Sequence, residues 1–415
     1  MKARLQSGFE TLCSLAGNGR SRNGWQRGPK RRILFCCGDF LPRPGGAQSV
    51  VDDLACAFHA AGHEVSVLTR RHPGTRALER LHGYDIVRID YPVAYEKFEE
   101  TEAFRSRSGD ILSRIEKILR ERRIDTVLIG LLDMSALYLY ALRQRIPFQL
   151  GLYLHGGETR KLPAAEPTYR ELLVLSLHTA DVIIAVSPKL AEEAMTRAPA
   201  AREKIRVIRN GINVRDLASV SPRKHRRDYI CFVGRLVPEK NLGRLIKAFR
   251  AISREVAAVD LLIAGSGREE KQLLRLAQSS DSNANEIQFL GSMSRKDAWA
   301  LIKGALFTVL PSITEGHPIV ALESLAMGRP LLASRIPGIL AATGEGRHAA
   351  LFPPKDLKAL TTLLRRYLGD RSALAALTAA AREIDPTSLD VAHLYREHLR
   401  ALDGIASTQP ATMLR

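Results

Sequence analysis

The stretch DYICFVGRLVPEKNLGRLIKAFRAISREVAAVDLLIAG, residues 228–265, contains one complete strand–loop–helix–strand pattern. Residues 228–234 form a short apolar run typical of a buried strand, and residues 242–256 carry apolar side chains at helical spacing. A second apolar run follows at 259–265. Two strands joined by a crossover helix form the basic unit of a parallel sheet, so this stretch predicts an α/β fold for the second half of the chain.

The first half of the chain opens with the same pattern. Residues 32–37, RILFCC, are an apolar run, and a Gly/Pro-rich loop and the helical pattern SVVDDLACAFHAAG at 49–62 follow it. The next predicted strand is HEVSVLT at 63–69. We therefore predict two doubly wound α/β domains, joined at the polar, basic segment 218–228.

The remaining apolar runs complete both predicted sheets. They are 125–130, 148–156, 181–187 and 204–211 in the first half, and 286–291, 306–312 and 330–334 in the second. The predicted organisation is a basic, disordered tail at 1–32, a first domain at 33–218, a second domain at 228–385, a helix at 386–402 and a tail at 403–415. Ligands of open α/β sheets bind beyond the carboxyl ends of the strands, so the loops after these runs are the candidates for a site.

Composition limits the classes to which the protein can belong. Its 415 residues suffice for two domains, and 45% hydrophobic residues favour a globular fold. The net charge of +18 favours anionic partners, but no aromatic-interleaved basic stripe or zinc-finger spacing supports nucleic acid. The five cysteines form no C-x-x-C pair, which indicates a reducing compartment, and no secretory signal is recognisable. The longest apolar run, 126–142, contains Asp133 and is short for a transmembrane helix.

Two glycine-containing loops follow predicted strands in the first half. Gly45 and Gly46 precede a predicted helix, where backbone N–H groups attract a phosphate, although an ordinary strand-to-helix turn has the same composition. His155 lies at the end of the strand predicted at 148–156, beside two glycines. It is either a ligand contact or a structural histidine.

The loops of the second half carry charged side chains. Arg235 and Lys240 flank a Pro-containing turn near a predicted helix start. A guanidinium and an ammonium in one loop suit a diphosphate, and the alternative is two solvated charges. Gly265 ends the strand predicted at 259–265 and permits either a close ligand or a tight helix entry.

The segment EGHPIVALE, residues 315–323, carries a carboxylate at each end. Glu315 is predicted to lie in the loop after the strand at 306–312, and Glu323 on the helix that follows Pro318. A plain surface helix is the simpler interpretation. However, the segment around Glu323 is otherwise apolar, and a buried carboxylate there requires partners.

Taken in order, eight of these motifs resemble the retaining glycosyltransferases of the GT-B fold, in the large family 4 group. The motifs are GGAQ, LHGG, ADVIIAVS, VIRNGIN, VGRLVPEKN, IAGSG, IQFLG and EGHPIVALE, and the resemblance covers roughly residues 33–400. It implies two Rossmann-like domains that face each other across a cleft, with a C-terminal helix returning to the first domain. Glu315 and Glu323, with seven residues between them, correspond to the Glu-x7-Glu motif of the family.

The resemblance also implies roles for individual residues. Arg235 and Lys240 would hold the diphosphate of a nucleotide-sugar donor, where negative charge develops as the sugar leaves. Glu315 would contact the donor sugar, and Glu323 the ribose hydroxyls. His155 would lie near the reacting centre. The remaining donor-binding positions are Gly45, Gly46, Gly265, Leu290, Gly316 and Ile319.

We therefore expect a sugar transfer from a nucleotide-sugar donor to a saccharide or lipid-linked acceptor, with retention of anomeric configuration. The chain has no D-x-D pair, so we expect no essential metal, and no cofactor besides the donor as a co-substrate. Two alternatives stay open: a sugar-nucleotide 2-epimerase, and a non-catalytic nucleotide-sugar-binding homologue. The segment 334–354 departs from the Gly-Gly-x-Pro-Glu run of many relatives, which leaves the diphosphate contacts of that turn and the identity of the donor undecided.

The expected location is the cytoplasm, with a peripheral association with the inner face of the membrane. Polysaccharide biosynthesis on lipid-linked acceptors is common in the family that the motifs resemble. The basic segment 105–123 has apolar residues on one helical face, which either packs on the first sheet or binds an anionic membrane surface.

Overall fold

The computed structural model describes residues 2–16, 30–43, 45–91, 102–160, 167–256, 258–278 and 286–404. These residues form two compact α/β units. The first unit contains most of the chain up to Arg209 and the end of the C-terminal helix. The main part of the second unit begins at Asn210. The boundary lies ahead of the predicted 218–228 junction, because Ile212 pairs with Asp390 of the second unit.

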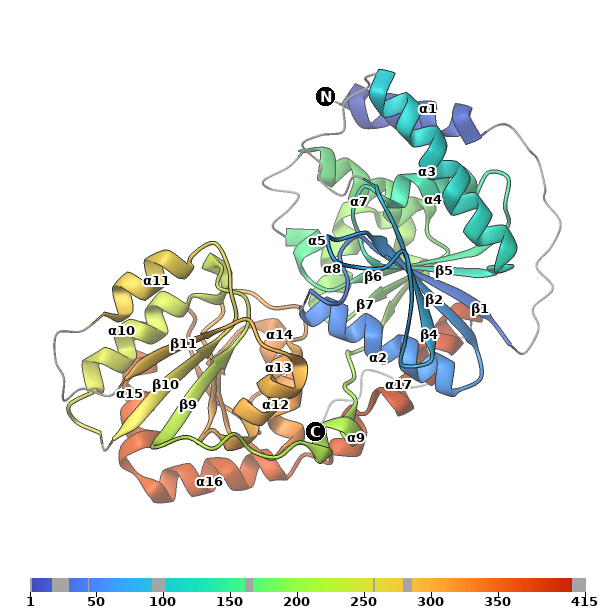
Figure 1. The fold of residues 1–415 in the computed structure, drawn as a ribbon. Helices are drawn as coiled ribbons and strands as arrows, with labels where there is room; N and C mark the ends of the chain where they lie inside the picture. Colours follow the sequence, from blue (N-terminus) through green and yellow to red (C-terminus); the bar gives the residue numbers. More distant parts are fainter. Residues whose placement is uncertain are drawn as a thin grey trace. The chain divides into compact units, whose positions relative to one another are not determined.

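The first unit is built on an eight-stranded sheet in the order β3-β4-β2-β1-β5-β6-β7-β8 (Figure 1). All neighbouring pairs are parallel except β3 with β4. The strands are β1 (Arg32–Cys37), β2 (Glu64–Arg70), β3 (Leu78–Leu81), β4 (Tyr84–Ile89), β5 (Thr126–Leu131), β6 (Gln149–Leu154), β7 (Val182–Ala185) and β8 (Ile205–Val207). All the strands predicted in this half are confirmed within a few residues, and the β3–β4 hairpin was not predicted.

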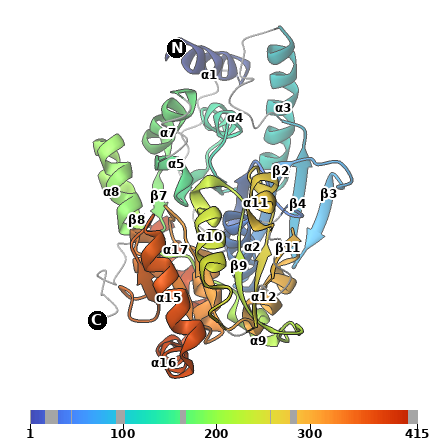
Figure 2. The ribbon, with the colours of Figure 1, turned by 90° about the vertical axis from the view of Figure 1, so that its left-hand side faces the viewer.

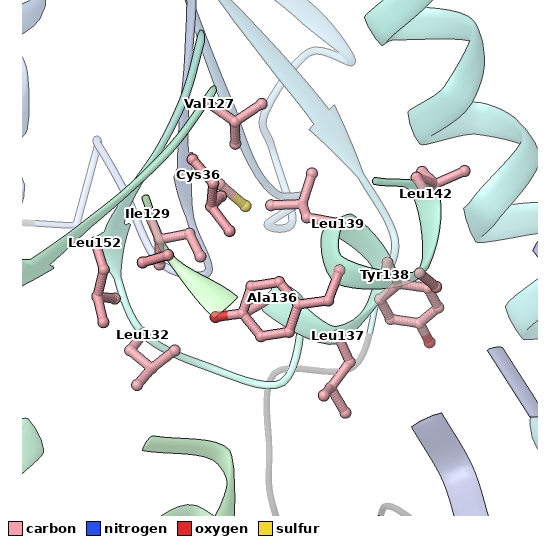
Figure 3. Packing of buried hydrophobic residues seen from close by; sticks show 14 of the residues in the cluster. Cys36, Val127, Ile129, Leu132, Ala136, Leu137, Tyr138, Leu139, Leu142 and Leu152 are labelled. Carbon is pink, nitrogen blue, oxygen red and sulfur yellow. The ribbon is translucent and has the colours of Figure 1, made fainter. Parts of the chain in front are cut away.

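Successive side chains of the buried strands point to opposite faces of the first sheet. On one face, Cys36 belongs to an apolar cluster that includes the residues of α4 (Ala136–Leu142), as Figure 3 shows. On the other face, the ring centroid of Phe35 lies 6.1 Å from that of Phe58 on α2 (Gly46–Ala60). The other helices of this unit are α1 (Lys2–Ala16), α3 (Glu102–Glu121), α5 (Gly157–Arg160), α7 (Pro167–Thr179) and α8 (Pro188–Arg197).

The apolar face of the basic segment 105–123 is used for packing. This segment falls in α3, and Ile111, Leu112, Ile115 and Leu119 are all buried in the core of the first unit. Of the two interpretations of this helix, the structure therefore confirms packing. The interpretation of this apolar face as a membrane-binding surface is wrong, because its side chains are already covered by protein.

The N-terminal segment is helical where the sequence predicts a disordered tail. α1 packs against α3, α4 and α7 (Figure 2), and its Leu12 and Ala16 are fully buried. The prediction of disorder is wrong over 2–16, because apolar side chains of this basic segment have a surface of the first unit on which to pack. Residues 17–29 of the predicted tail, and residues 405–415 at the other end, lie outside the described residues.

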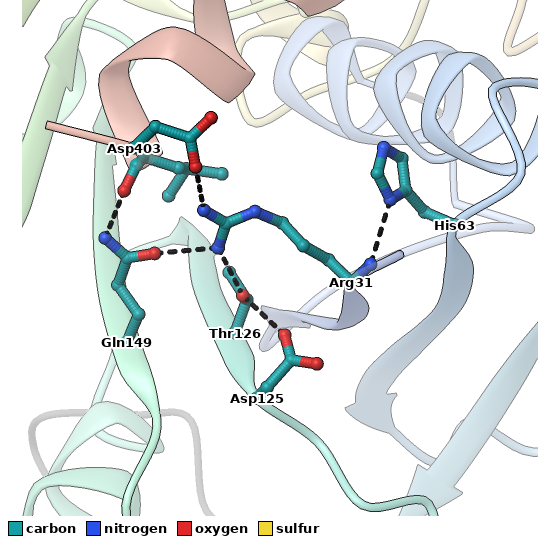
Figure 4. A network of polar contacts seen from close by, with 7 residues as sticks. Arg31, His63, Asp125, Thr126, Gln149 and Asp403 are labelled. Atoms are coloured by element: carbon teal, nitrogen blue, oxygen red, sulfur yellow. Dashed lines mark hydrogen bonds and ion pairs between the residues drawn. The ribbon is translucent and has the colours of Figure 1, made fainter. Parts of the chain in front are cut away.

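The predicted C-terminal helix and its return to the first unit are confirmed. A short 3-10 turn, η4 (Pro386–Leu389), precedes α17 (Val391–Leu402), and His398 on α17 lies 3.0 Å from the Tyr153 hydroxyl of β6. Just beyond the helix, the Asp403 carboxylate accepts a hydrogen bond from Arg31 (Figure 4). The Arg31 guanidinium also donates to the Gln149 side-chain oxygen at 2.8 Å. Arg31 thus lies in the folded unit and not in the predicted tail.

The second unit is built on a six-stranded parallel sheet in the order β11-β10-β9-β12-β13-β14 (Figure 1). Its strands are β9 (Asp228–Val233), β10 (Val259–Ala264), β11 (Ile287–Gly291), β12 (Thr308–Leu310), β13 (Leu331–Ser334) and β14 (Ala350–Phe352). Five of the six strands were predicted, and β14 was not. The order is that of the Rossmann fold, 3-2-1-4-5-6, and it reverses between β9 and β12.

Two separate apolar clusters cover the faces of the second sheet. One contains Phe232 of β9 and Phe249 of α10, and the other contains Cys231 of β9 and Ile302 of α12. The helices are α9 (Val214–Ser219), α10 (Leu242–Ile252), α11 (Glu270–Ala277), α12 (Arg295–Gly304), α13 (Ile319–Ala326), α14 (Pro337–Ala342), α15 (Leu357–Gly369) and α16 (Arg371–Arg382). Helices on both faces make this a doubly wound sheet, as the sequence predicts.

Among the described residues, no helix combines the length and the apolar character needed to cross a membrane. All five cysteines lie in the described part of the chain, and none of them is in a disulfide. The expectation of a reducing compartment agrees with this but stays a prediction.

Candidate active site

Two loops meet at the point where the strand order of the second sheet reverses. One follows β9 and contains Arg235 and Lys240, and the other follows β12 and contains Glu315. Open α/β sheets bind their ligands beyond the carboxyl ends of the strands at such a reversal. The topology therefore places these predicted site residues at the position where a ligand is expected.

Hydrogen bonds to main-chain carbonyl oxygens hold the two loops together. The N–H group of Ile313 donates to the carbonyl oxygen of Glu239 at 2.8 Å. The side-chain amide of Asn241 donates to the carbonyl oxygen of Pro311 at 3.1 Å, and Asn241 itself adopts a left-handed conformation with φ of 53°. Asn is among the few non-glycine residues that adopt this conformation readily. The local sequence thus fixes how the Lys240 loop sits on the Glu315 loop.

Lys240 and Glu315 form an ion pair at this position. The distance from Lys240 Nζ to Glu315 Oε1 is 2.5 Å, and both side chains are largely buried, with exposed fractions of 19% and 11%. The Ser312 hydroxyl donates to the same Glu315 oxygen at 2.6 Å. Arg235, five residues before Lys240, is exposed. The site thus offers an ammonium, a guanidinium and a carboxylate, which can bind an anionic group next to a hydroxyl-bearing one.

Glu323 is buried on α13 and has the partners that its environment requires. Trp299 Nε1 donates to Glu323 Oε1 at 2.6 Å, and Arg295 Nε lies 3.5 Å from the same oxygen. The Arg295 guanidinium also lies 4.7 Å from the centroid of the Trp299 ring. Trp299 and Arg295 both come from α12 and were not identified from the sequence, although a carboxylate in an apolar helix is itself a signal that such partners exist.

Gly265 lies where the backbones of neighbouring loops come together. Its φ is +132°, and a Cβ added there would lie 1.9 Å from the carbonyl oxygen of Gly234. The Gly265 N–H donates to the carbonyl oxygen of Gly291 at 2.8 Å. Only glycine combines this conformation with this approach. The predicted site position Leu290 is partly buried at the end of β11, next to Gly291.

The segment 334–354, which departs from the Gly-Gly-x-Pro-Glu run of many relatives, still makes a close main-chain contact with the Glu315 loop. A Cβ on Gly338, at the start of α14, would lie 2.4 Å from the carbonyl oxygen of Glu315 and 2.6 Å from that of Gly316. Gly316 and Ile319, both predicted donor positions, are buried. The loop after β13 therefore supports the Glu315 loop through the main chain, with Gly338 following Pro337 where the Gly-Gly-x-Pro-Glu run of many relatives has a glutamate.

The remaining predicted residues are Gly45 and Gly46, which belong to the second unit, and His155, which belongs to the first. Gly46 begins α2 and Gly45 precedes it. His155 follows β6, its Nε2 lies 2.9 Å from the carbonyl oxygen of Gly130, and its ring stacks on Tyr153. Burial lowers the pKa of His155, so the imidazole is neutral, with its proton on Nε2. Glu158, not identified from the sequence, accepts the backbone N–H of His155 at 3.1 Å.

Two family models match the chain, over adjoining stretches. Residues 44–216 match Glycosyltransferase Family 4, and residues 214–384 match the glycosyl transferases group 1 model. The chain belongs to the group 1 glycosyltransferases. This confirms the resemblance stated from the motifs. The protein is accordingly an enzyme of glycosyl transfer, and the site at the β9–β12 reversal lies within the group 1 region.

Curated relatives of this glycosyltransferase include a Corynebacterium glutamicum enzyme described as a GDP-mannose-dependent monoacylated alpha-(1-6)-phosphatidylinositol monomannoside mannosyltransferase. It is 27% identical over 376 residues, which cover 85% of this chain and 92% of the relative. Glycogen synthase of Mycobacterium tuberculosis is 31% identical over 205 residues, 49% of either chain. The first relative thus matches nearly end to end, and the second over about half of its length.

Solved structures confirm the fold of the glycosyltransferase. Sucrose-phosphate synthase from Thermosynechococcus elongatus has a TM-score of 0.71 at 23% identity, covering 90% of this chain and all of that one. Anabaena Alr3699/HepE, solved in complex with UDP and glucose, has a TM-score of 0.70 at 18% identity, covering 90% of this chain and 99% of that one. The predicted GT-B fold with two Rossmann-like domains is confirmed.

Proposed function

We propose that this glycosyltransferase transfers a hexose from a nucleoside diphosphate sugar to a saccharide or lipid-linked acceptor, with retention of anomeric configuration and without a catalytic metal. The observation that carries the proposal is the Lys240–Glu315 pair at the reversal point of the second sheet, with a distance of 2.5 Å. The two loops hold a cation, which suits the diphosphate of a nucleotide sugar, next to a carboxylate, which suits the hydroxyl groups of the sugar.

Each residue has a separate task in this proposal. Lys240 and Arg235 neutralise the charge that accumulates on the diphosphate as the bond to the anomeric carbon breaks. Donor binding separates Lys240 from Glu315, and the Glu315 carboxylate then accepts hydrogen bonds from hydroxyl groups of the sugar. Glu323, which is oriented by Trp299, accepts hydrogen bonds from the ribose hydroxyls. Because these cations are provided by the chain itself, the leaving group needs no metal.

His155 is proposed to contact the sugar as a hydrogen-bond acceptor. Its Nε2 is committed to the carbonyl oxygen of Gly130, so the lone pair is on Nδ1. No described residue bonds to this buried Nδ1 atom. A neutral imidazole can accept a hydrogen bond from a sugar hydroxyl there without placing a second positive charge next to the developing cationic sugar ring.

The relatives and the charge support the acceptor class and the location. The Corynebacterium relative acts on a phosphatidylinositol monomannoside, as its description states. A net charge of +18 favours approach to an anionic surface. We therefore propose a peripheral enzyme at the cytoplasmic face of a membrane that works on lipid-linked or polysaccharide acceptors.

A panel of nucleotides tests the donor site. UDP, GDP, ADP and CMP are each added to the purified chain, and the melting temperature is measured. A nucleotide that binds only the folded state raises the free energy of unfolding by RT ln(1 + [L]/Kd) and therefore raises the melting temperature. We expect one nucleoside diphosphate to do so, and the Arg235→Ala variant to respond less. Failure of all four nucleotides would contradict the proposed site.

Product formation separates transfer from the alternatives. The donor selected by the panel is incubated with and without a lipid-linked saccharide acceptor, and the free nucleoside diphosphate is measured. A transferase releases it only with acceptor, a 2-epimerase leaves it bound to the isomerised sugar, and a non-catalytic homologue releases none. We expect Arg235→Ala to lower turnover by roughly 10²–10³-fold. Arg275→Ala, which changes an exposed arginine in the last turn of α11, serves as the matched control.

A further inference from the structure

Three side chains that can bind a metal ion lie together where α2 meets the β3–β4 turn. Asp52 and Cys56 are one helical turn apart on α2, and His82 is in the two-residue turn. Asp52 Oδ1 lies 3.0 Å from His82 Nδ1 and 3.7 Å from Cys56 Sγ. All three ligand atoms lie within 4.8 Å of one another. Two donors thus converge on one carboxylate oxygen.

Two of these distances match the edges of a tetrahedral zinc site. With zinc–ligand bonds of about 2.0–2.3 Å, neighbouring ligand atoms of such a site lie about 3–4 Å apart. The 3.0 Å and 3.7 Å separations in this cluster fall in that range. A thiolate, an imidazole and a carboxylate together favour Zn²⁺ over Mg²⁺ or Ca²⁺, which prefer oxygen ligands. Two anionic ligands also balance the charge of the ion.

Tyr84 provides the outer hydrogen bond that metal sites commonly contain. Its hydroxyl donates to Asp52 Oδ1 at 2.8 Å. Because that oxygen accepts the Tyr84 hydrogen bond, the carboxylate is oriented before a metal arrives.

We propose that Asp52, Cys56 and His82 bind one Zn²⁺ ion, with a water molecule as the fourth ligand. Binding releases the proton of the Cys56 thiol to solvent, and the His82 proton moves to Nε2 so that Nδ1 can donate its lone pair to the metal. The ion joins α2 to the β3–β4 hairpin. It uses none of the donor-binding residues, so the proposal does not depend on the proposed function.

The His82 position offers a variant that preserves the fold. His82 and Gly83 have φ of 50° and 94°, so both central residues of the turn are left-handed. Asn is the residue preferred before Gly in such a hairpin turn. His82→Asn therefore keeps the backbone and removes the imidazole. We expect this variant to have an unchanged melting temperature without metal and to bind Zn²⁺ at least about 10-fold more weakly, as loss of an outer partner alone does in other sites.

The other cysteines provide controls within the same chain. Cys36 and Cys231 are buried, and burial raises the pKa of each thiol to about 12, so they are poor metal ligands. Cys13 is partly exposed, like Cys56. Cys13→Ser should therefore leave metal binding unchanged, whereas Cys56→Ser should abolish it.

The experiment is a Co²⁺ titration of the full chain after treatment with a chelator, followed by displacement with Zn²⁺. We expect a thiolate-to-cobalt absorption band that saturates at one equivalent and disappears on adding Zn²⁺. The band should be retained in Cys13→Ser and lost in Cys56→Ser. No band in the unmodified chain, or an equal band in Cys56→Ser, overturns the proposal. In either case the cluster is a hydrogen-bonded link between α2 and the hairpin.

Discussion

Glu323 is a carboxylate whose position depends on two side chains of another helix. Trp299 and Arg295 fix one of its oxygens. Glu323→Gln keeps an oxygen that can accept the Trp299 N–H, but it loses the charge that strengthens hydrogen bonds from ribose hydroxyls. Since a hydrogen bond to a charged group contributes about 1.5–3 kcal/mol, we expect Kd for the nucleoside diphosphate to rise roughly 10- to 100-fold.

Calorimetric titration of the nucleotide measures this change, and thermal unfolding shows whether the fold is intact. Trp299→Phe is the companion variant, because it leaves the Glu323 charge in place and removes its buried donor. It should lower the melting temperature as well as the affinity. Unchanged affinity in both variants would mean that Glu323 has a structural role only.

Asp133 is buried just after β5, and burial raises its pKa from 3.8 to about 6. Between these two values the folded state holds the proton more tightly than the unfolded state does. Asp133 therefore lowers stability as the pH rises from about 4 to about 7, by at most about 3 kcal/mol. Asp133→Asn removes this cost and keeps an acceptor for the Ser135 N–H, 2.7 Å away.

The stability gain of Asp133→Asn over the unmodified chain should accordingly be larger at neutral pH than at about pH 4. Urea unfolding of both proteins across this range measures it. A difference that stays constant with pH would contradict the assignment of a raised pKa.

At the residue scale, the sequence identified the side chains that follow strands, and it did not identify their partners. Lys240 and Glu315 could be predicted because the ends of neighbouring parallel strands bring their loops to one edge. Trp299 lies 24 residues from Glu323 along the chain and meets it only because α12 and α13 pack together. Contacts of that kind depend on helix packing, which apolar periodicity does not specify.

At the scale of elements, most strands could be predicted from apolar runs, whereas the β3–β4 hairpin and β14 could not. β1 and β9 are continuous apolar runs, since both of their faces are covered. β3 reads LERL, with side chains that are exposed or only partly buried at the sheet edge, and β4 reads YDIVRI, with charged residues between its apolar ones. α1 was missed because the basic residues of segment 1–32, most of which follow the helix, obscure the apolar side chains of α1.

The loop after β10 carries a prediction at this scale. Gly265→Ala places a Cβ against the Gly234 carbonyl oxygen, in a backbone conformation that L-residues rarely adopt. The loops after β9 and β10 must then move apart, so we expect a loss of several kcal/mol in stability and of nucleotide binding together. Gly243→Ala is the matched control, because its nearest neighbour is a Leu276 methyl group at 3.5 Å. It should unfold at the same or a slightly higher temperature.

At the scale of the whole molecule, the net charge of +18 makes a prediction about membranes. Each Lys or Arg near an anionic surface contributes about 1 kcal/mol, and this attraction is screened within about 10 Å at 0.1 M salt. The apolar face of α3 is buried, so it provides no hydrophobic insertion. We therefore expect the full chain to sediment with phosphatidylglycerol vesicles at low salt and to be released as salt is raised.

Phosphatidylcholine vesicles, which carry no net charge, are the control. Equal binding to both vesicle types, or binding that resists salt, would show that an apolar surface and not the charge holds the enzyme at the membrane.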